Sequence, residues 1–271
     1  MESKNSFVLV TKSANLFKIT IDLLRHIQKN INIDFNKDGI FIEVANQKNT
    51  KLIYVCFEKD KMNYLSRQQL ICGVNTGHLY NIIKCIKKKD SLKIEDRKND
   101  LIITPIKSDF NGSSNNSLKI LTTIKTEIEI PSDYKSEEIS CFNKDILRII
   151  KELQSIKSPL LVISKSNNVL KFYCEKGELY NSANYLGNQR DFDDDKVDWT
   201  QNFKMEDFVN LTKLINISNI VKFTCEDEMP LRMSLSNDIG YITLYLKSNE
   251  MITIEEEDAE NENQFFKDGE E

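Results

Sequence analysis

One order of predicted elements occurs twice in this chain, and the two copies lie about 130 residues apart. Apolar residues at helical spacing predict a helix over 13–29, and alternating apolar residues predict a β-hairpin over 31–44. The same helix and hairpin recur over 143–156 and 160–174. An internal repeat of this kind restricts the chain to two similar domains that combine helices with antiparallel strands, which is the α+β class.

Each copy continues with a second helix and further strands. Asn75 to about Lys87 and Met205 to about Ile217 carry the apolar spacing of helices, and strands are predicted after both. Pro105 is expected near a strand end or an edge, because proline cannot donate a backbone hydrogen bond. Ser13 is expected to cap the first helix through its side-chain oxygen. The side chains expected to be buried on that helix are Leu16, Leu23, Leu24 and Ile27.

Charge is distributed unevenly along the chain. The whole chain carries a formal net charge of -5, whereas the nine acidic residues and the single lysine from Glu255 onward give that segment -8. Residues 1–254 therefore carry +3, so the body of the protein is mildly basic. A self-repelling segment of low hydrophobicity buries too little apolar surface to fold, so residues 255–271 are expected to be a disordered acidic tail.

The sequence contains no motif of a nucleotide-dependent or metal-dependent enzyme. The six cysteines lie singly, the two histidines have no partners at metal-ligand spacing, and the eight glycines form no phosphate-binding loop. The acidic run Asp191, Asp193, Asp194 and Asp195 fits a solvated loop better than a metal site, because metal sites draw ligands from separated elements. No run of 18 apolar residues is present. We therefore expect no enzyme activity, no metal, no cofactor and no membrane partner.

Cations recur on the outward faces of the predicted helices. A single helix with outward lysines usually just faces solvent, but repetition across equivalent helices favours a continuous positive surface. Lysine and arginine bind phosphates without reading bases, so this surface is expected to bind double-stranded DNA independently of sequence. The residues assigned to it are Lys18, Arg25, Lys29, Lys84, Lys87, Lys88, Lys144, Arg148, Lys151 and Lys213.

Four stretches of the chain follow one another in a characteristic order and spacing. They are Phe17–Ile40 (FKITIDLLRHIQKNINIDFNKDGI), Gly73–Ile94 (GVNTGHLYNIIKCIKKKDSLKI), Ile128–Tyr134 (IEIPSDY) and Met229–Leu235 (MPLRMSL). Together with Tyr241–Leu246 and the acidic tail, they resemble the proliferating cell nuclear antigen (PCNA) family of DNA sliding clamps. The resemblance extends from Phe7 to about Ile254.

The resemblance implies the DNA-clamp, or processivity, fold, in which each of two similar domains has two inner helices and outer antiparallel sheets. It places clamp domains at 1–119 and 136–254, with an interdomain connecting loop at 120–135. It also implies a homotrimeric ring. Ring closure would join an edge strand near Ser113–Lys119 to one near Gly177–Tyr185 of the next subunit.

The resemblance further implies a pocket that accepts short motifs of partner proteins. The residues that match it are Leu52, Ile128, Ile130, Pro131, Met229, Pro230, Leu231 and Tyr245. These residues are also expected to pack the connecting loop against its sheet, and the two roles are compatible. Lys247 and Ser248 stand where the family commonly has Ala-Pro, so the preferred motif is expected to differ from the familiar one.

The leading hypothesis is a sliding clamp that encircles duplex DNA, tethers a DNA polymerase and recruits replication and repair proteins with PCNA-interacting motifs. A clamp loader is then a further partner, and the site of action is the nucleus, or a cytoplasmic viral replication site if the chain is viral. Two alternatives keep the fold: a subunit of a hetero-oligomeric checkpoint ring, and a monomeric viral accessory factor for replication or transcription. A metal-dependent nuclease that uses the acidic run is a third alternative.

Overall fold

The protein forms two compact units in a computed structural model that describes residues 5–109, 114–122, 128–177, 180–211 and 217–268. The first unit comprises residues 1–130, 213–219 and 234–244, and the second comprises 131–212, 220–233 and 245–271. The first unit thus includes residues 234–244, which the sequence analysis placed in the second domain. The domain limits predicted at 119, 135 and 254 stay a prediction.

The first unit contains two helices and most of the strands. Its elements are β1 (Phe7–Thr11), α1 (Ala14–Leu24), β2 (Asn30–Asn36), β3 (Gly39–Ala45), β4 (Lys51–Glu58), η1 (Lys59–Lys61), β5 (Asn63–Ser66), β6 (Leu70–Asn75), α2 (Thr76–Ile83), β7 (Ser91–Arg97), β8 (Asp100–Ile106) and β9 (Asn116–Lys119). Most of β17 (Gly240–Leu246) and the second half of β16 (Leu231–Asn237) also belong to it.

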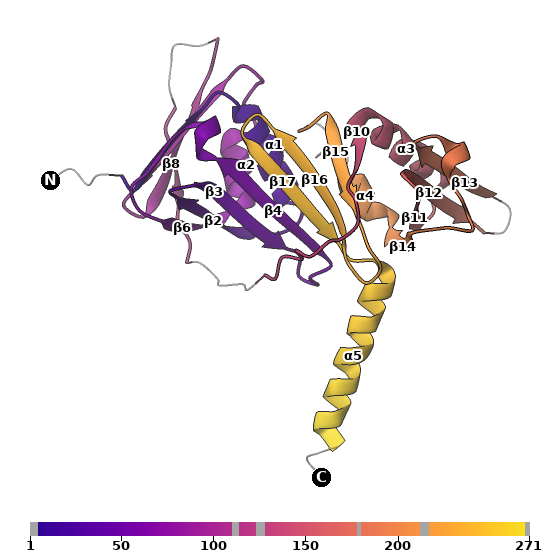
Figure 1. Cartoon of the computed structure of the whole chain (residues 1–271). Coiled ribbons are helices and arrows are strands. Elements are labelled where there is room, and N and C mark those ends of the chain that lie inside the picture. Colours follow the sequence, from indigo (N-terminus) through magenta and orange to yellow (C-terminus); the bar gives the residue numbers. More distant parts are fainter. Residues whose placement is uncertain (1–4, 110–113, 123–127, 178–179, 212–216, 269–271) are drawn as a thin grey trace. The chain divides into compact units, whose positions relative to one another are not determined.

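The strands of this unit form two antiparallel runs. One is the five-stranded sheet β5-β1-β7-β8-β9, and the other is the run β6-β2-β3-β4-β17. Helices α1 and α2 lie beside each other, as Figure 1 shows. The apolar face of α1 is buried, and the ring of Phe17 packs against that of Phe57 in β4 at 5.5 Å. Phe7 and Phe35 stack at 3.8 Å and link β1 to β2.

Two glycines permit close approach to β4. Gly39 has φ +151°, and a Cβ atom there would overlap the carbonyl oxygen of Phe57. Gly240 has φ +158°, and a Cβ atom there would overlap the carbonyl of Cys56. Only glycine adopts such a backbone without strain, so these two positions fix how β3 and β17 pack on β4.

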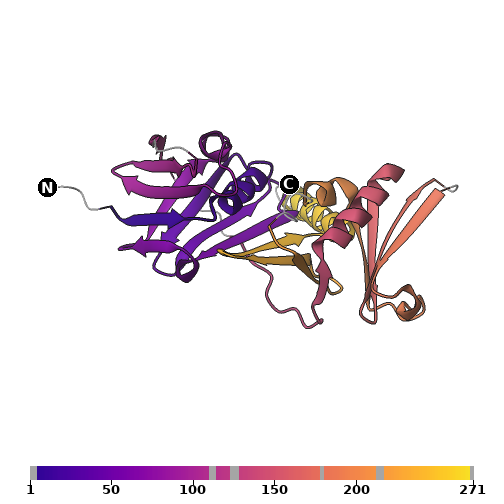
Figure 2. The same cartoon turned by 90° about the horizontal axis from the view of Figure 1, so that it is seen from above.

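The second unit has its own helices and strands. Its elements are β10 (Ile139–Phe142), α3 (Asn143–Ile156), β11 (Leu160–Ser166), β12 (Val169–Lys176), β13 (Tyr180–Leu186), η2 (Gln189–Asp191), β14 (Trp199–Lys204), α4 (Met205–Leu211), β15 (Ile220–Thr224), the first half of β16 and α5 (Asn249–Asp268). The sheet order is β13-β12-β11-β14, and β10 pairs with β15. Helix α3 buries Ile146, Ile149, Ile150 and Leu153, as its spacing predicts. Figure 2 shows the second unit from another direction, with α3 as its rose-coloured helix.

The predicted α+β class, both hairpins and the limits of the third helix are confirmed. Pro105 lies near the end of β8, beyond the residues that pair with β9, so its missing N–H leaves no gap in that ladder. Five of the six cysteines are buried as free thiols, and Cys85 is exposed. None of the helices in the described ranges is long and apolar enough to cross a membrane.

The first two helices are shorter than predicted. Helix α1 ends at Leu24 rather than near Lys29, and α2 ends at Ile83 rather than near Lys87. The predicted side-chain cap of α1 is also wrong, because Ser13 accepts the Leu16 amide through its main-chain carbonyl. On α1, Leu16 is only half-buried, whereas Phe17 lies in the core.

The acidic C-terminal segment is helical rather than disordered, since α5 continues through Asp268. Its first turn is anchored: the Ser248 carbonyl accepts from the Ile252 amide, and Glu250 accepts from the main chain and side chain of Asn202 in β14. Lys247 pairs with Glu255 at 2.5 Å. A fixed first turn removes the cost of helix nucleation, and acidic residues near the N-terminus favour the helix dipole, so the composition of the segment does not prevent folding.

Candidate nucleic-acid interface and partner surface

The cations of α1 are held by neighbours. The ammonium group of Lys18 donates to the carbonyl of Ile86, in the turn that follows α2. The Arg25 guanidinium pairs with Asp22 at 2.6 Å and lies 4.2 Å from the centre of the Tyr80 ring. Both cations therefore tie α1 to its surroundings, and their donors are partly occupied.

The remaining cations assigned to the first unit lie outside its helices, because both helices end early. Lys29 precedes β2, Lys84 is the C-cap of α2, and Lys87 and Lys88 follow in the loop. All four are exposed. Lys87 pairs with Asp109 at 2.9 Å, and this hydrogen bond raises the pKa of Lys87 and lowers the pKa of Asp109. The cations predicted to lie on the outward face of the second helix therefore lie instead at its C-terminal end and in the loop that follows.

The cations of α3 lie on the helix, as predicted, and they are more open. Lys144, Arg148 and Lys151 are exposed on one face. Arg148 approaches Glu152 at 3.9 Å, with 68% of its side chain exposed. Lys144 lies 5.4 Å from the centre of the Phe142 ring, and Lys151 makes no hydrogen bond or ion pair among the residues that the structure describes. This row is available to an anionic ligand.

Lys213, the last predicted DNA contact, lies outside the described residues, as do its neighbours 212–216. Helix α4 is described only from Met205 to Leu211. In that part Glu206 is exposed, so the described part of α4 does not extend the positive surface.

The acidic run lies in the connection between β13 and β14. Asp194 pairs with Lys171 at 2.7 Å, and Asp193 accepts from the amide of Asp195. Across the described ranges, no three histidine, cysteine or acidic side chains are grouped so as to hold a metal ion. Local pairing accounts for the contacts of these carboxylates.

The connecting loop is anchored at each described end. At its start, the Leu121 amide donates to the carbonyl of Gly73 at 2.8 Å, and a Cβ atom on Gly73 would crowd Leu121. At its end, within the second unit, the Tyr134 hydroxyl donates to the Pro230 carbonyl at 2.7 Å. The Arg232 guanidinium covers the Tyr134 ring at 4.7 Å. The ends of the loop are therefore fixed to the two units separately.

The predicted partner-binding residues are divided between the units. Leu52, Ile128 and Ile130 belong to the first, and Pro131, Met229, Pro230, Leu231 and Tyr245 belong to the second. Leu231 is fully buried and Pro230 and Tyr245 are nearly so, which fits a packing role. Ile128, Ile130, Pro131 and Met229 are half-exposed and available for contact. A common pocket for all eight stays a prediction.

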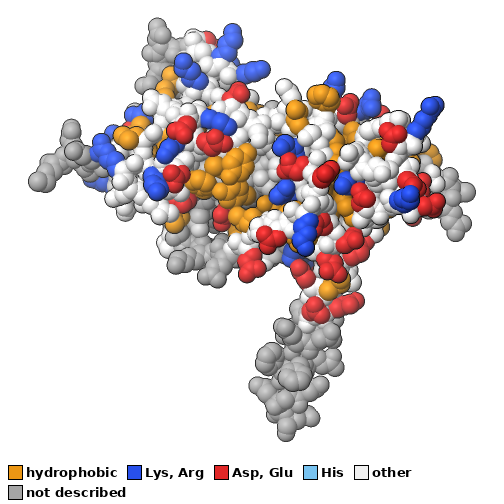
Figure 3. All heavy atoms as spheres, in the orientation of Figure 1, with side chains coloured by type: hydrophobic (Ala, Val, Ile, Leu, Met, Phe, Trp, Pro, Cys, Tyr) orange, Lys and Arg blue, Asp and Glu red, His pale blue; other side chains and the backbone are white. Residues whose placement is uncertain are grey.

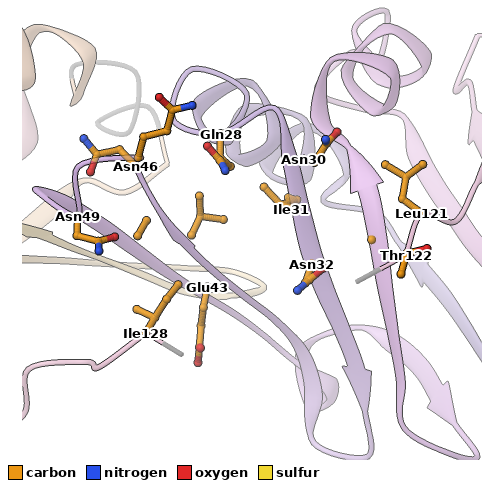
Figure 4. Close-up of a pocket in the computed structure, with 14 residues that line it drawn as sticks. Gln28, Asn30, Ile31, Asn32, Glu43, Asn46, Asn49, Leu121, Thr122 and Ile128 are labelled. Carbon is orange, nitrogen blue, oxygen red and sulfur yellow. The ribbon is translucent and has the colours of Figure 1, made fainter. Parts of the chain in front are cut away.

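A pocket of about 450 Å³ lies within the first unit, and Figure 4 shows its lining. Ile128 is the predicted partner residue that lines it. The other walls come from β2, β3 and the start of the connecting loop, and they are rich in amides. Glu43 is the carboxylate of the lining, and burial, followed by the charge of Asp34, raises its pKa. The sequence pattern gave no sign of this pocket because its residues come from separated segments.

Two edge strands match those predicted for ring closure. Strand β9 ends the five-stranded sheet and β13 ends the four-stranded sheet, and within the described ranges each pairs with a single strand, β8 and β12 respectively. Residues 110–113, at the start of the first predicted edge, lie outside the described residues. An unpaired edge strand offers backbone donors and acceptors to another chain.

Comparison with known proteins gives a consistent result. Residues 7–129 match the model of the proliferating cell nuclear antigen N-terminal domain. The chain is 21% identical over 247 residues to the proliferating cell nuclear antigen of Chaetomium thermophilum. The alignment covers 87% of this chain and 95% of that relative. It is also 24% identical over 243 residues to the uncharacterized protein 436R of Invertebrate iridescent virus 6, covering 80% of this chain and 79% of that one.

A solved structure shares the fold. The crystal structure of the proliferating cell nuclear antigen from Entamoeba histolytica superposes with a TM-score of 0.78 at 18% identity. The match covers 91% of this chain and 100% of that one. The likeness therefore extends beyond the first unit and includes most of the described chain.

Proposed function

We propose that this chain, which belongs with the PCNA-like clamps, acts as a DNA sliding clamp without catalytic activity of its own. In this proposal three copies close head to tail around duplex DNA and hold a polymerase on its template. The topological link, rather than a tight contact, keeps the protein on DNA.

The observation that carries the proposal is the open row of cations on α3. Lys144, Arg148 and Lys151 are exposed on one face of a helix, with at most a long ion pair to Glu152. Flexible cations without fixed partners attract phosphates and specify no base, which suits a protein that must slide. The body charge of +3 is consistent with a weak contact.

Ring closure is supported by the free edges of β9 and β13. A head-to-tail contact between two different edges generates a closed ring when the rotation between subunits permits it. The half-exposed Ile128, Ile130, Pro131 and Met229 are the proposed contacts for motifs of polymerase and repair partners. The proposed place of action is the nucleus, or a cytoplasmic viral replication site.

The test joins a mass measurement to a polymerase assay. We expect a three-subunit mass at micromolar concentration and, with a clamp loader, longer products on circular templates than on linear ones with free ends, because a ring slides off an end. Blocking both ends of the linear template is expected to restore long products. A monomer that stimulates synthesis equally on all three templates would refute the ring.

The same mass measurement separates the two related functions. A monomer would favour the viral accessory factor, and a stable complex only with different clamp-like chains would favour the hetero-oligomeric ring. As a control, Arg148→Glu with Lys151→Glu is expected to keep the three-subunit mass and shorten the products, because the change lies on an exposed helix face.

A further inference from the structure

An aromatic row lies on the solvent side of β3, β4 and β17, within the first unit. Phe41 and Tyr54 have ring centres 6.3 Å apart, and Tyr54 and Tyr241 stack with centres 5.9 Å apart. All three rings are half-exposed. Figure 3 shows hydrophobic side chains gathered over this part of the sheet. The outer face of an antiparallel sheet usually carries polar side chains, so three aligned aromatic rings call for an explanation.

Two of these rings pack on each other. The planes of the Tyr54 and Tyr241 rings are inclined by only 29°, and both side chains are half-buried. Burial is the main cause that raises the pKa of Tyr54, and the neighbouring Tyr241 adds to it. The stacked pair is present before any ligand binds, which lowers the entropy cost of binding.

Two carboxylates lie beside the row. The register pairs Glu43 in β3 with Tyr54 in β4, and Asp34 in β2 with Phe41 in β3. Directly paired residues on one face have Cβ atoms roughly 5 Å apart, and residues two apart on a strand are separated by roughly 7 Å. The carboxylates and the rings thus form one continuous acidic and aromatic surface on four adjacent strands, β2, β3, β4 and β17.

These carboxylates lack a cation among the described residues. Asp34 accepts hydrogen bonds from the neutral amides of Gln69 and Asn36, and the Glu43 side chain makes no hydrogen bond or ion pair with the part of the chain that the structure describes. Lys61, in η1 directly after β4, is paired with Glu58 at 3.2 Å. Burial and the nearby charge of Asp34 raise the pKa of Glu43, which is the response of a carboxylate that no cation compensates.

Aromatic faces and unpaired carboxylates share one complementary ligand. A cation stacks on a tyrosine ring and pairs with a carboxylate, and a guanidinium group does both through its planar surface and its paired N–H donors. The ammonium group of lysine carries the same charge, but it lacks the planar surface and the paired N–H donors of a guanidinium group. Arginine therefore fits this surface better than lysine.

We propose that the surface formed by Phe41, Tyr54, Tyr241, Glu43 and Asp34 binds an arginine-bearing segment of a partner protein. The guanidinium stacks on the Tyr54 and Tyr241 rings and donates to Glu43, whose two oxygens are open, while Asp34 adds negative charge. None of the residues assigned to the motif pocket takes part, and the proposal does not depend on ring closure or DNA binding.

The experiment measures binding of a fluorescein-labelled peptide of sequence GSRLRSG to the full-length protein by fluorescence anisotropy. Two companion peptides replace both arginines by lysine or by citrulline, which keeps the shape of arginine and removes its charge. We expect the arginine peptide to bind, the lysine peptide to bind about threefold to tenfold more weakly, and the citrulline peptide to lose most of its affinity.

Matched variants locate the site. Glu43→Gln and Tyr54→Leu are expected to weaken the arginine peptide by about tenfold, which corresponds to the loss of one charge-assisted contact or one stacked ring. Glu58→Gln, on the same strand but already paired with Lys61, is the control and is expected to leave binding unchanged.

Three results of the peptide measurements would overturn the proposal. They are equal binding of the arginine and citrulline peptides, equal effects of Glu43→Gln and Glu58→Gln, and no binding of the arginine peptide at millimolar concentration. Self-association that is lost in Tyr54→Leu would also overturn it, because the occupant would then be a second copy of this chain. Circular dichroism of each variant confirms that a loss of binding is not a loss of fold.

Discussion

Three basic residues of the first unit, Lys18, Arg25 and Lys87, differ from those of α3 in what surrounds them. Around α1 and α2, Lys18 is bound to the carbonyl of Ile86, Arg25 to Asp22 and Tyr80, and Lys87 to Asp109. On α3, the long contact of Arg148 with Glu152 is the only ion pair that a cation makes among the described residues. Cations of similar spacing therefore divide into those that support the fold and those that are open to a ligand.

The difference teaches that a basic stripe is not by itself a binding surface. A cation that already has a carboxylate or carbonyl partner must give up that contact to bind phosphate, so its net contribution to affinity is small. An exposed cation releases only counterions and water. We expect α3 to dominate DNA binding and the α1–α2 cations to contribute more to stability.

The largest expected effect is on α3. Arg148→Glu with Lys151→Glu is expected to lower affinity for a linear duplex by at least about tenfold and the salt slope by about two, because each lost phosphate contact reduces the slope by about one. Filter binding across a salt series measures both quantities. An equal loss of affinity in Lys87→Glu with Lys88→Glu would contradict the proposed difference between the cations of the two units.

The next effect concerns stability. Lys18→Met is expected to lower the free energy of unfolding by about 1–2 kcal/mol, because it removes a charge-assisted bond to the Ile86 carbonyl. Lys151→Met, on the exposed face of α3, is expected to change it by less than about 0.5 kcal/mol. Urea denaturation followed by circular dichroism tests the pair, and equal losses would contradict the division into supporting and open cations.

A smaller effect is expected from releasing a held cation. Asp109→Asn frees Lys87 and is expected to raise DNA affinity by about twofold to threefold, with a steeper salt slope. Glu152→Gln serves as the matched change on α3, where Arg148 is already open, and is expected to have the smaller effect. Reversal of that order would show that the Lys87 pair does not limit binding.

The smallest effect is on ionisation. The hydrogen bond from Lys87 lowers the pKa of Asp109, so the contribution of this pair to stability is present above the unfolded-state pKa and is lost as pH falls through the lowered folded-state pKa. We expect the carboxyl carbon of Asp109 to titrate at higher pH in Lys87→Gln than in the native protein. Nuclear magnetic resonance measures both curves, and superimposable curves would mean that the pair does not form in solution.

Periodic local features were predictable from the sequence. The apolar spacing over 143–156 gave both the limits of α3 and its exposed cations, because a helix with one buried face leaves a regular pattern. The two hairpins followed from alternation and turn residues. Helix ends were less predictable, since the apolar Ile27 and Ile86 continue the helical spacing of α1 and α2 after each helix has ended.

Contacts between distant segments were not predictable. The residues around Lys18 do not predict its bond to the Ile86 carbonyl, and those around Lys87 do not predict its pairing with Asp109. Each pair is brought together by the packing of other elements. The same is true of Glu250 and Asn202, which help anchor a helix where composition predicted disorder. The surface of Phe41, Tyr54 and Tyr241 was also missed, since it exists only through the register of β3 with β4 and the order of β4 and β17.

The sequence alone determined the α+β class, the internal repeat, the apolar faces of the helices and the resemblance to sliding clamps, because these depend on residue spacing along the chain. Tertiary structure alone decided which cations are held and which are open, where α1 and α2 end, and which side chains share a surface. The physical reason is that electrostatic and hydrogen-bonding partners are chosen by distance in space, and sequence spacing fixes that distance only within one helix or one hairpin.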